Sequence, residues 1–311
     1  MSQYIKLEDA LPLLEKIVNK NVKAARRQYI PKIKVEKGMG DEEEAVLLFS
    51  DLQYGVKTPS TNMNIISNRV VKLAEALVKI ITIQRSAIPI NKLNIFMMGD
   101  MIQSEDILWK VDLDALECVI NKQMFEGAIP ATEKFLLTVA PYFPGGIDVW
   151  CVPGNHGNLG RMNAVTTNWD TIIYKILKAL TANYPEIRWH IEDEKFYQIV
   201  NIMGTKFMVV HGDCIPRYLN IPVYGITQRL MRWQGSIEAF DVLCMGHFHT
   251  PINMDWNQAE YLVNGTFVSD DQWALKVIGM ATTPKQILFG VHPRKGISFY
   301  YKLKLNGKKE K

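Results

Sequence analysis

Residues 147–157 read IDVWCVPGNHG, an apolar run that breaks at a proline and a glycine and leads directly into Asn155 and His156. The run over 147–152 predicts a buried strand, because it is short, apolar and bounded by turn-forming residues. In α/β folds the chemistry lies just beyond the carboxyl ends of such strands, where the connecting loops converge on one edge of the sheet. The segment therefore predicts both a core strand and the position of a site.

Four further segments follow the same plan. Long helical patterns at 64–84 and 112–139 alternate with the early strands, which indicates an α/β domain whose strands are buried on both faces. Beyond residue 251 the pattern changes to short strands and turns, which is more typical of an antiparallel sheet. The four additional strands are expected at 45–50, 93–98, 206–210 and 242–245, and they lead into Asp51 and Gln53, into Asp100, into His211, and into His247 and His249.

Length and composition agree with a globular chain. The 311 residues are 48% hydrophobic and 22% charged, which excludes a mainly disordered chain and a collagen-like one. Residues 1–44 are expected to form an N-terminal helix and a polar linker, and residues 45–311 the main domain. The net charge of +4 is compatible with a phosphate-bearing partner without requiring nucleic acid.

The compartment is expected to be the cytoplasm. The four cysteines form no CxxC pair, which favours reduced thiols and argues against a disulfide-stapled fold. The first 20 residues contain acids and lack the apolar core of a signal peptide. No apolar run approaches the roughly 18 residues that a membrane helix needs, so no membrane partner is expected. The oligomeric state is left open by the sequence.

The residues that follow the strands all carry oxygen or nitrogen atoms that can bind a metal ion. They offer carboxylate oxygen, amide oxygen and imidazole nitrogen, and four of the six histidines lie among them. This set suits Mn²⁺, Fe or Zn²⁺ better than Ca²⁺ or Mg²⁺, which prefer oxygen alone. His247 and His249 are two residues apart, so both rings face the same side of an extended backbone.

Taken in order, these segments resemble the calcineurin-like metallophosphoesterase superfamily, whose signature is D-x-H, G-D, G-N-H, H and G-H-x-H. The resemblance covers about residues 45–270 and is closest to its phage-type or DNA-repair-nuclease-like members. It implies a four-layer α/β/β/α sandwich with two mixed sheets, and two divalent ions that activate a bridging hydroxide. Manganese is favoured for these ions, with iron or zinc as alternatives. By this resemblance the first ion is held by Asp51, Gln53 and His249, the second by Asn155, His211 and His247, with Asp100 bridging and His156 as the catalytic residue that assists the leaving oxygen.

One position departs from the family pattern. Gln53 stands where the family usually has histidine, and its neutral carbonyl oxygen binds Mn²⁺ or Fe less tightly than imidazole. Three functions stay open at this point. The favoured one is a phosphodiesterase, specifically a nuclease acting on DNA. The others are a phosphomonoesterase acting on a protein or small molecule, and a scaffold protein with impaired metal binding.

Two residues beyond the Asn155–His156 segment are candidates for substrate binding. Arg161 could grip a phosphate, and Trp169 could stack on a base. The alternative for Trp169 is structural, because Trp169 and Asp170 could begin the next helix, with the acid near the positive end of the helix dipole.

Overall fold

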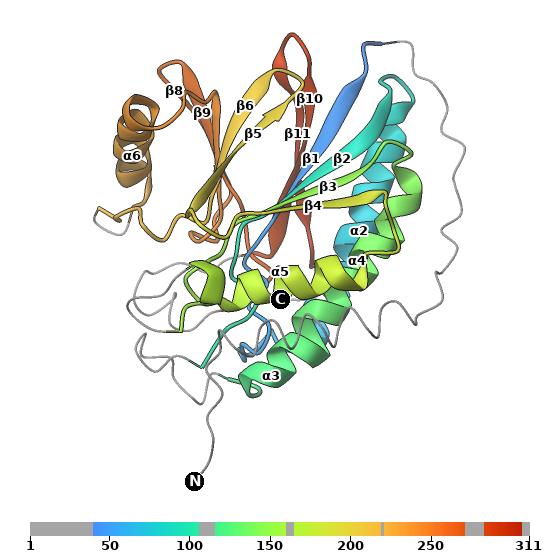
Figure 1. The fold of residues 1–311 in the computed structure, drawn as a ribbon, viewed down its shortest axis with the longest axis vertical. Helices are drawn as coiled ribbons and strands as arrows, with labels where there is room; N and C mark the ends of the chain where they lie inside the picture. Colours follow the sequence, from blue (N-terminus) through green and yellow to red (C-terminus); the bar gives the residue numbers. More distant parts are fainter. Residues whose placement is uncertain (1–39, 106–115, 160–164, 219–220, 271–282, 307–311) are drawn as a thin grey trace.

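The computed structural model describes residues 40–105, 116–159, 165–218, 221–270 and 283–306. Their strands form two sheets, of six and five strands (Figure 1). The larger sheet has the order β11-β10-β1-β2-β3-β4. Its strands are β1 (Glu43–Phe49), β2 (Ile90–Met97), β3 (Gly146–Cys151), β4 (Ile187–Ile191), β10 (Lys285–His292) and β11 (Gly296–Lys304).

The smaller sheet has the order β5-β6-β7-β9-β8. Both sheets are mixed. In the larger one β1, β2, β3 and β4 run parallel, β10 runs antiparallel to β1, and β11 runs antiparallel to β10. In the smaller one β6, β7 and β9 run parallel between two antiparallel outer strands. The strands of this sheet are β5 (Tyr197–Ile202), β6 (Thr205–Val210), β7 (Val242–Met245), β8 (Ile252–Trp256) and β9 (Ala259–Val263).

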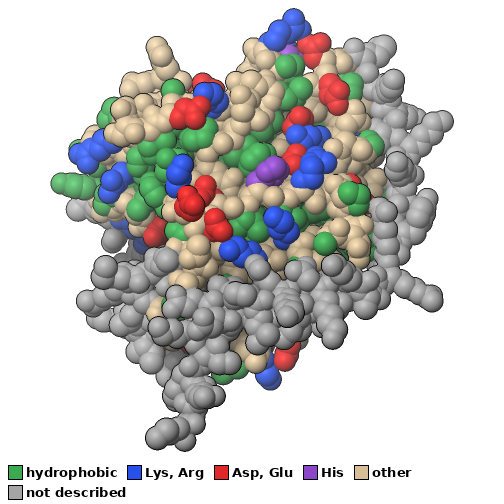
Figure 2. All heavy atoms as spheres, viewed as in Figure 1, with side chains coloured by type: hydrophobic (Ala, Val, Ile, Leu, Met, Phe, Trp, Pro, Cys, Tyr) green, Lys and Arg blue, Asp and Glu red, His purple; other side chains and the backbone are tan. Residues whose placement is uncertain are grey.

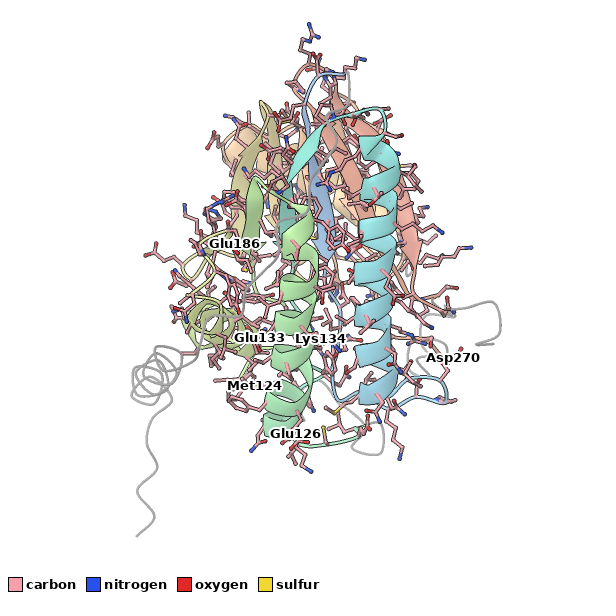
Figure 3. The ribbon with its side chains drawn as sticks, turned by 90° about the vertical axis from the view of Figure 1, so that its right-hand side faces the viewer. Met124, Glu126, Glu133, Lys134, Glu186 and Asp270 are labelled. Atoms are coloured by element: carbon pink, nitrogen blue, oxygen red, sulfur yellow. The ribbon has the colours of Figure 1, made fainter. Side chains whose placement is uncertain are left out.

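The helices lie on the outer faces of the two sheets. Figure 3 shows α2 and α4 running side by side, with Glu133 and Lys134 on α4. In the described ranges the helical elements are α2 (Met63–Arg85), α3 (Ile120–Lys122), a π-helical turn (Gln123–Ala128), α4 (Ile129–Val139), α5 (Trp169–Leu180), α6 (Val223–Ser236) and two 3₁₀ turns, Ala140–Tyr142 and Val165–Thr167.

Three apolar layers separate four structural layers. Alternation along β1 shows how the chain builds them: Leu47 packs toward the helices, whereas Leu48 packs toward the other sheet. The first apolar layer lies between the larger sheet and the helices α2, α4 and α5. The second joins the two sheets, and the third lies between the smaller sheet and α6. The predicted α/β/β/α sandwich with two mixed sheets is therefore confirmed.

The predicted helix over 112–139 is wrong in its first part. In the described residues it begins at Ile120 and passes through the π turn before α4. The buried amide of Gln123 explains this path, since it accepts a hydrogen bond from Ser104 N at 2.9 Å and donates one to Cys118 O at 2.9 Å. A side chain fixed from two segments in this way constrains the local register of the helix.

The region beyond residue 251 does not form a separate antiparallel sheet. Its two hairpins are antiparallel, as expected, but β9 joins the smaller sheet parallel to β7, and β10 joins the larger sheet beside β1. The expected N-terminal helix lies outside the described residues, so the division at residue 44 stays a prediction. Within the described ranges, no helix combines the length and the apolar character that a membrane span requires.

Candidate metal centre

The candidate site lies where parallel strands of both sheets end. Backbone hydrogen bonds hold these ends together: Asp51 N donates to Gly99 O at 3.1 Å, and Gln53 N donates to Asp100 O at 3.0 Å. The two sheets are joined at the same place, because the Nδ1 atom of His211, which follows β6, lies 2.6 Å from the carbonyl oxygen of Met98, which follows β2. The carboxyl ends of five strands thus converge on one edge of the sandwich.

Among the described residues, one group of three His, Cys, Asp or Glu side chains could share an ion. Its members are Asp100, His211 and His247, whose ligand atoms all lie within 4.8 Å of one another. Asp100 Oδ2 lies 3.1 Å from His211 Nε2, and His247 Nδ1 lies 3.3 Å from the same nitrogen. Asn155 Oδ1 is also 3.0 Å from His211 Nε2. The structure therefore brings Asp100, the predicted bridging residue, together with all three residues predicted for the second ion.

The donor atoms fit a divalent transition metal. Ligands held at about 2.0–2.2 Å from one cation are separated from each other by roughly 2.8–3.6 Å, from octahedral to tetrahedral geometry. The three contacts to His211 Nε2 fall in or near this interval. One carboxylate, one amide oxygen and two imidazoles also match the ligand preference of Mn²⁺, Fe and Zn²⁺.

The residues predicted for the first ion are only partly brought together. Asp51 Oδ1 lies 3.3 Å from His249 Nε2, and it also accepts the backbone N–H of His247 at 3.1 Å. The Gln53 side chain contacts the catalytic candidate instead, because its Nε2 atom lies 3.3 Å from His156 Nε2.

Burial divides the site into a closed floor and a more open rim. Asp51, Asp100 and His211 are at most 1% exposed. Asn155, His156, His247 and His249 are half-buried or partly exposed, with 23% of the His156 side chain accessible. A phosphoryl group could therefore approach the imidazole groups from solvent while the carboxylates stay covered.

The buried charges perturb one another in the way a cation site requires. Burial alone would raise the pKa of Asp100, but His211 and His156 outweigh it and lower that pKa. Burial alone would lower the pKa of His211, but the Asp100 carboxylate raises it to about 10. The pKa of His247 is well below its usual value, because of burial and the neighbouring His211 charge. An ion bound by Asp100 and His211 would require His211 to release its Nε2 proton, since a metal ligand has to be deprotonated.

Five of the predicted ligands have a left-handed backbone. The φ angles of these five non-glycine residues lie between 49° and 63°, a conformation that costs roughly 1–2 kcal/mol per residue. Strain of this kind persists where the surrounding structure fixes it, and it clusters at functional sites. The residues are Asp51, Gln53, Asp100, His247 and His249.

Asp170 supports the site from α5. Its buried carboxylate accepts the backbone N–H groups of Asp100 at 2.8 Å, Met101 at 3.0 Å and Gly154 at 2.9 Å. Burial and the Asp100 charge raise the pKa of Asp170 to about 6, despite these three hydrogen bonds. One side chain thus fixes the two loops that present Asp100 and Asn155.

The structural interpretation of residues 168–170 is correct. Asn168 caps α5 by accepting the Asp170 N–H at 2.8 Å, and its amide donates to Gly154 O at 2.8 Å. Trp169 is partly buried and packs on the apolar layer beneath the helices. Its proposed stacking on a base stays a prediction. Arg161 lies outside the described residues, so its role stays a prediction as well.

Comparison with known proteins gives structural neighbours but no family assignment. No protein-family model matches the chain, and no curated protein matches it. One similar structure is an archaeal phosphodiesterase with 13% identity, a TM-score of 0.41, and coverage of 83% of this chain and 98% of that one. A predicted phosphoesterase from Streptococcus pneumoniae has 12% identity, a TM-score of 0.36, and coverage of 81% and 86%. Vps29 from Entamoeba histolytica, complexed with zinc, has 10% identity, a TM-score of 0.36, and coverage of 84% and 99%. At such low identity and TM-score, function has to be argued from the side chains of this chain.

Proposed function

We propose that this protein is a metal-dependent phosphoesterase that hydrolyses phosphodiester bonds, with DNA as the substrate. The observation that carries the proposal is the meeting of Asp100, Asn155, His211 and His247 around one point, with the more exposed His156 at its rim. Divalent ions bound there would neutralise the phosphoryl oxygens and activate the attacking water.

His156 is suited to protonate the leaving oxygen. Its Nδ1 atom lies 2.9 Å from the carbonyl oxygen of Gln103, which can only accept, so Nδ1 carries a hydrogen. The Nε2 atom is therefore the one that can carry the proton donated to the leaving oxygen. The Gln53 side chain can hydrogen-bond both the neutral and the protonated His156 ring. Its amide N–H donates to the neutral ring, and after a flip its carbonyl oxygen accepts from the protonated ring.

The backbone of His156 has a separate task. Its N–H donates to Asp100 Oδ1 at 2.9 Å, and this bond does not involve the ring. Replacing the ring with a methyl group should therefore remove the proton donor while leaving the bridging carboxylate in place.

Hydrolysis of two chromogenic substrates tests the proposal. With Mn²⁺ supplied, bis(p-nitrophenyl) phosphate should be cleaved faster than p-nitrophenyl phosphate. His156→Ala should lower the rate by about 10²-fold or more, with unchanged metal content by elemental analysis. His190→Ala is the matched control, because His190 is a half-exposed histidine that contacts Asp148 in the larger sheet. It should leave the rate unchanged.

The other outcomes separate the alternatives. Faster cleavage of the monoester would identify a phosphomonoesterase. No turnover with any divalent ion, together with fewer than two ions per chain, would support the scaffold protein. Loss of metal in His156→Ala would make His156 a ligand and contradict its assigned role.

A further inference from the structure

An exposed aromatic pair is formed by Tyr218, on the segment that connects His211 to α6, and Tyr224, in the first turn of α6. Tyr218 is 65% exposed and Tyr224 is 56% exposed, and their ring centroids are 5.1 Å apart. Ile221, beside them, is 59% exposed. Three exposed apolar side chains at one place exceed the scattered single residues that need no explanation. We call Tyr218, Ile221 and Tyr224 the tyrosine platform.

Backbone contacts position the described residues of the platform. Tyr218 and Ile221 exchange two backbone hydrogen bonds, of 3.1 and 2.8 Å. The start of α6 packs closely on the preceding segment, because a Cβ atom at Gly225 would lie 1.9 Å from Pro216 O.

Contacts connect the platform to the metal centre. The guanidinium group of Arg217 lies over the Phe248 ring at 5.4 Å, and Phe248 packs edge-on against His247 at 5.1 Å. The Arg217 charge is close enough to help lower the pKa of His247. The Arg217 cation lies beside the candidate ligands, and the two exposed rings come next along the chain. The cation suits a phosphate and the rings suit the base that follows it.

The surrounding charge is mainly basic. Arg232 is exposed and Arg229 is half-buried on α6, whereas Asp213 is the acid of the segment between His211 and Tyr218. Figure 2 shows apolar and basic side chains together over the region of α6. Aromatic rings interleaved with arginines are typical of surfaces that bind single-stranded nucleic acid.

We propose that the tyrosine platform stacks an unpaired nucleobase of single-stranded DNA while Arg217 contacts the adjoining phosphate. This proposal rests on the proposed function, since it names the form of DNA that the same site receives. A paired base is covered on both faces by its neighbours in the duplex, so the platform gives the protein a preference for single strands or frayed ends.

Binding of a fluorescent 12-nucleotide oligothymidylate tests the platform without any turnover. Measured by anisotropy in EDTA, Tyr218→Ala and Tyr224→Ala should each weaken binding by about 5- to 100-fold. Tyr218→Phe should bind as the wild type does, and Tyr218→Leu should bind as the alanine variant does, because stacking needs the ring. Trp256→Ala is the matched control: Trp256 is 39% exposed and pairs with Ala259, at the end of the smaller sheet away from His247.

Failure of this proposal is distinguishable from failure of the proposed function. Unchanged oligonucleotide binding by both alanine variants would overturn the platform, even if the diester is hydrolysed. The platform would also be overturned if the alanine variants lost duplex binding as much as single-strand binding, because that result would indicate general electrostatic attraction. Absence of diester hydrolysis would overturn the proposed function alone, because the anisotropy measurement does not depend on it.

Discussion

Gly154 offers the sharpest test of how the candidate metal centre is built. A Cβ atom at this position would lie 2.2 Å from Asp100 Oδ1 and 2.5 Å from Asp100 N. Asp100 cannot easily move away, because its N–H is bonded to Asp170 and its Oδ1 atom accepts the His156 N–H. Gly154→Ala therefore has to displace the Asp100 carboxylate by about 1 Å, a shift large enough to impair a positioned group.

The expected effect has two parts. Overpacking should lower the free energy of unfolding by about 1–3 kcal/mol. Displacement of Asp100 should weaken Mn²⁺ binding by about 10- to 100-fold, as loss of a ligand's support usually does. Titration calorimetry of the metal-free protein measures the affinity, and urea denaturation measures the stability.

Gly235→Ala is the control for the same chemical change. Gly235 lies in α6, and a Cβ atom there would meet nothing within 4 Å. Alanine at this helical position should stabilise the protein by about 0.4–1 kcal/mol without affecting Mn²⁺ binding. The reasoning would be refuted if Gly154→Ala bound Mn²⁺ within about twofold of the wild-type affinity.

Three further predictions concern neighbouring groups. Gln53→His should tighten Mn²⁺ retention, because imidazole is the better ligand, and an unchanged Mn²⁺ titration would show that Gln53 is not a ligand. Asp170→Asn places an amide donor against at least one of three buried backbone N–H groups. The free energy of unfolding should therefore fall by about 1–3 kcal/mol. An unaltered melting temperature would contradict this expectation. In EDTA, the folded protein holds a proton on His211 up to a pKa of about 10, whereas an unfolded histidine loses it near about 6.5. The contribution of His211 to the stability of the metal-free protein should therefore be fully present below about pH 6.5 and be lost as the pH rises through about 10. Protein loaded with Mn²⁺ should not lose stability in this pH range. If urea denaturation gives the same dependence of the free energy of unfolding on pH with and without Mn²⁺, His211 is not a ligand.

The strands could be predicted from the sequence because each is a short apolar run. The expected strand at 242–245 agrees with β7 at both ends, and the others agree within three residues. The donor residues follow these strands directly, so the parallel arrangement predicts that donors of the same sheet meet. The approach of His211 and His247 from the other sheet depends on how the two sheets pack. The sheet to which each C-terminal hairpin belongs could not be predicted, since strand partners are set by contacts distant in the chain.

The residues that hold the candidate ligands in place could not be predicted from the sequence pattern. Asp170 binds the backbone of Asp100, 70 positions earlier, and nothing in the local pattern at α5 distinguishes this from an ordinary helix start. Gln103 likewise fixes the His156 ring through its backbone carbonyl, which has no sequence signature. The exposed tyrosines were not predicted either, because their relation to the candidate metal centre depends on the Arg217–Phe248 contact across the two loops.

The division of the donors between the sheets explains why the site needs the whole sandwich. Asp51, Asp100 and Asn155 follow strands of the larger sheet, whereas His211 and His247 follow strands of the smaller one. The apolar layer between the sheets sets their separation, so it also sets the distance between carboxylate and imidazole. An ion bound by both groups would cross-link the sheets, and its binding free energy would add to the stability of the fold. The left-handed backbone at the ligands is then stabilised by the same packing that brings the donors together, which is why strain and metal-binding chemistry coincide at this edge.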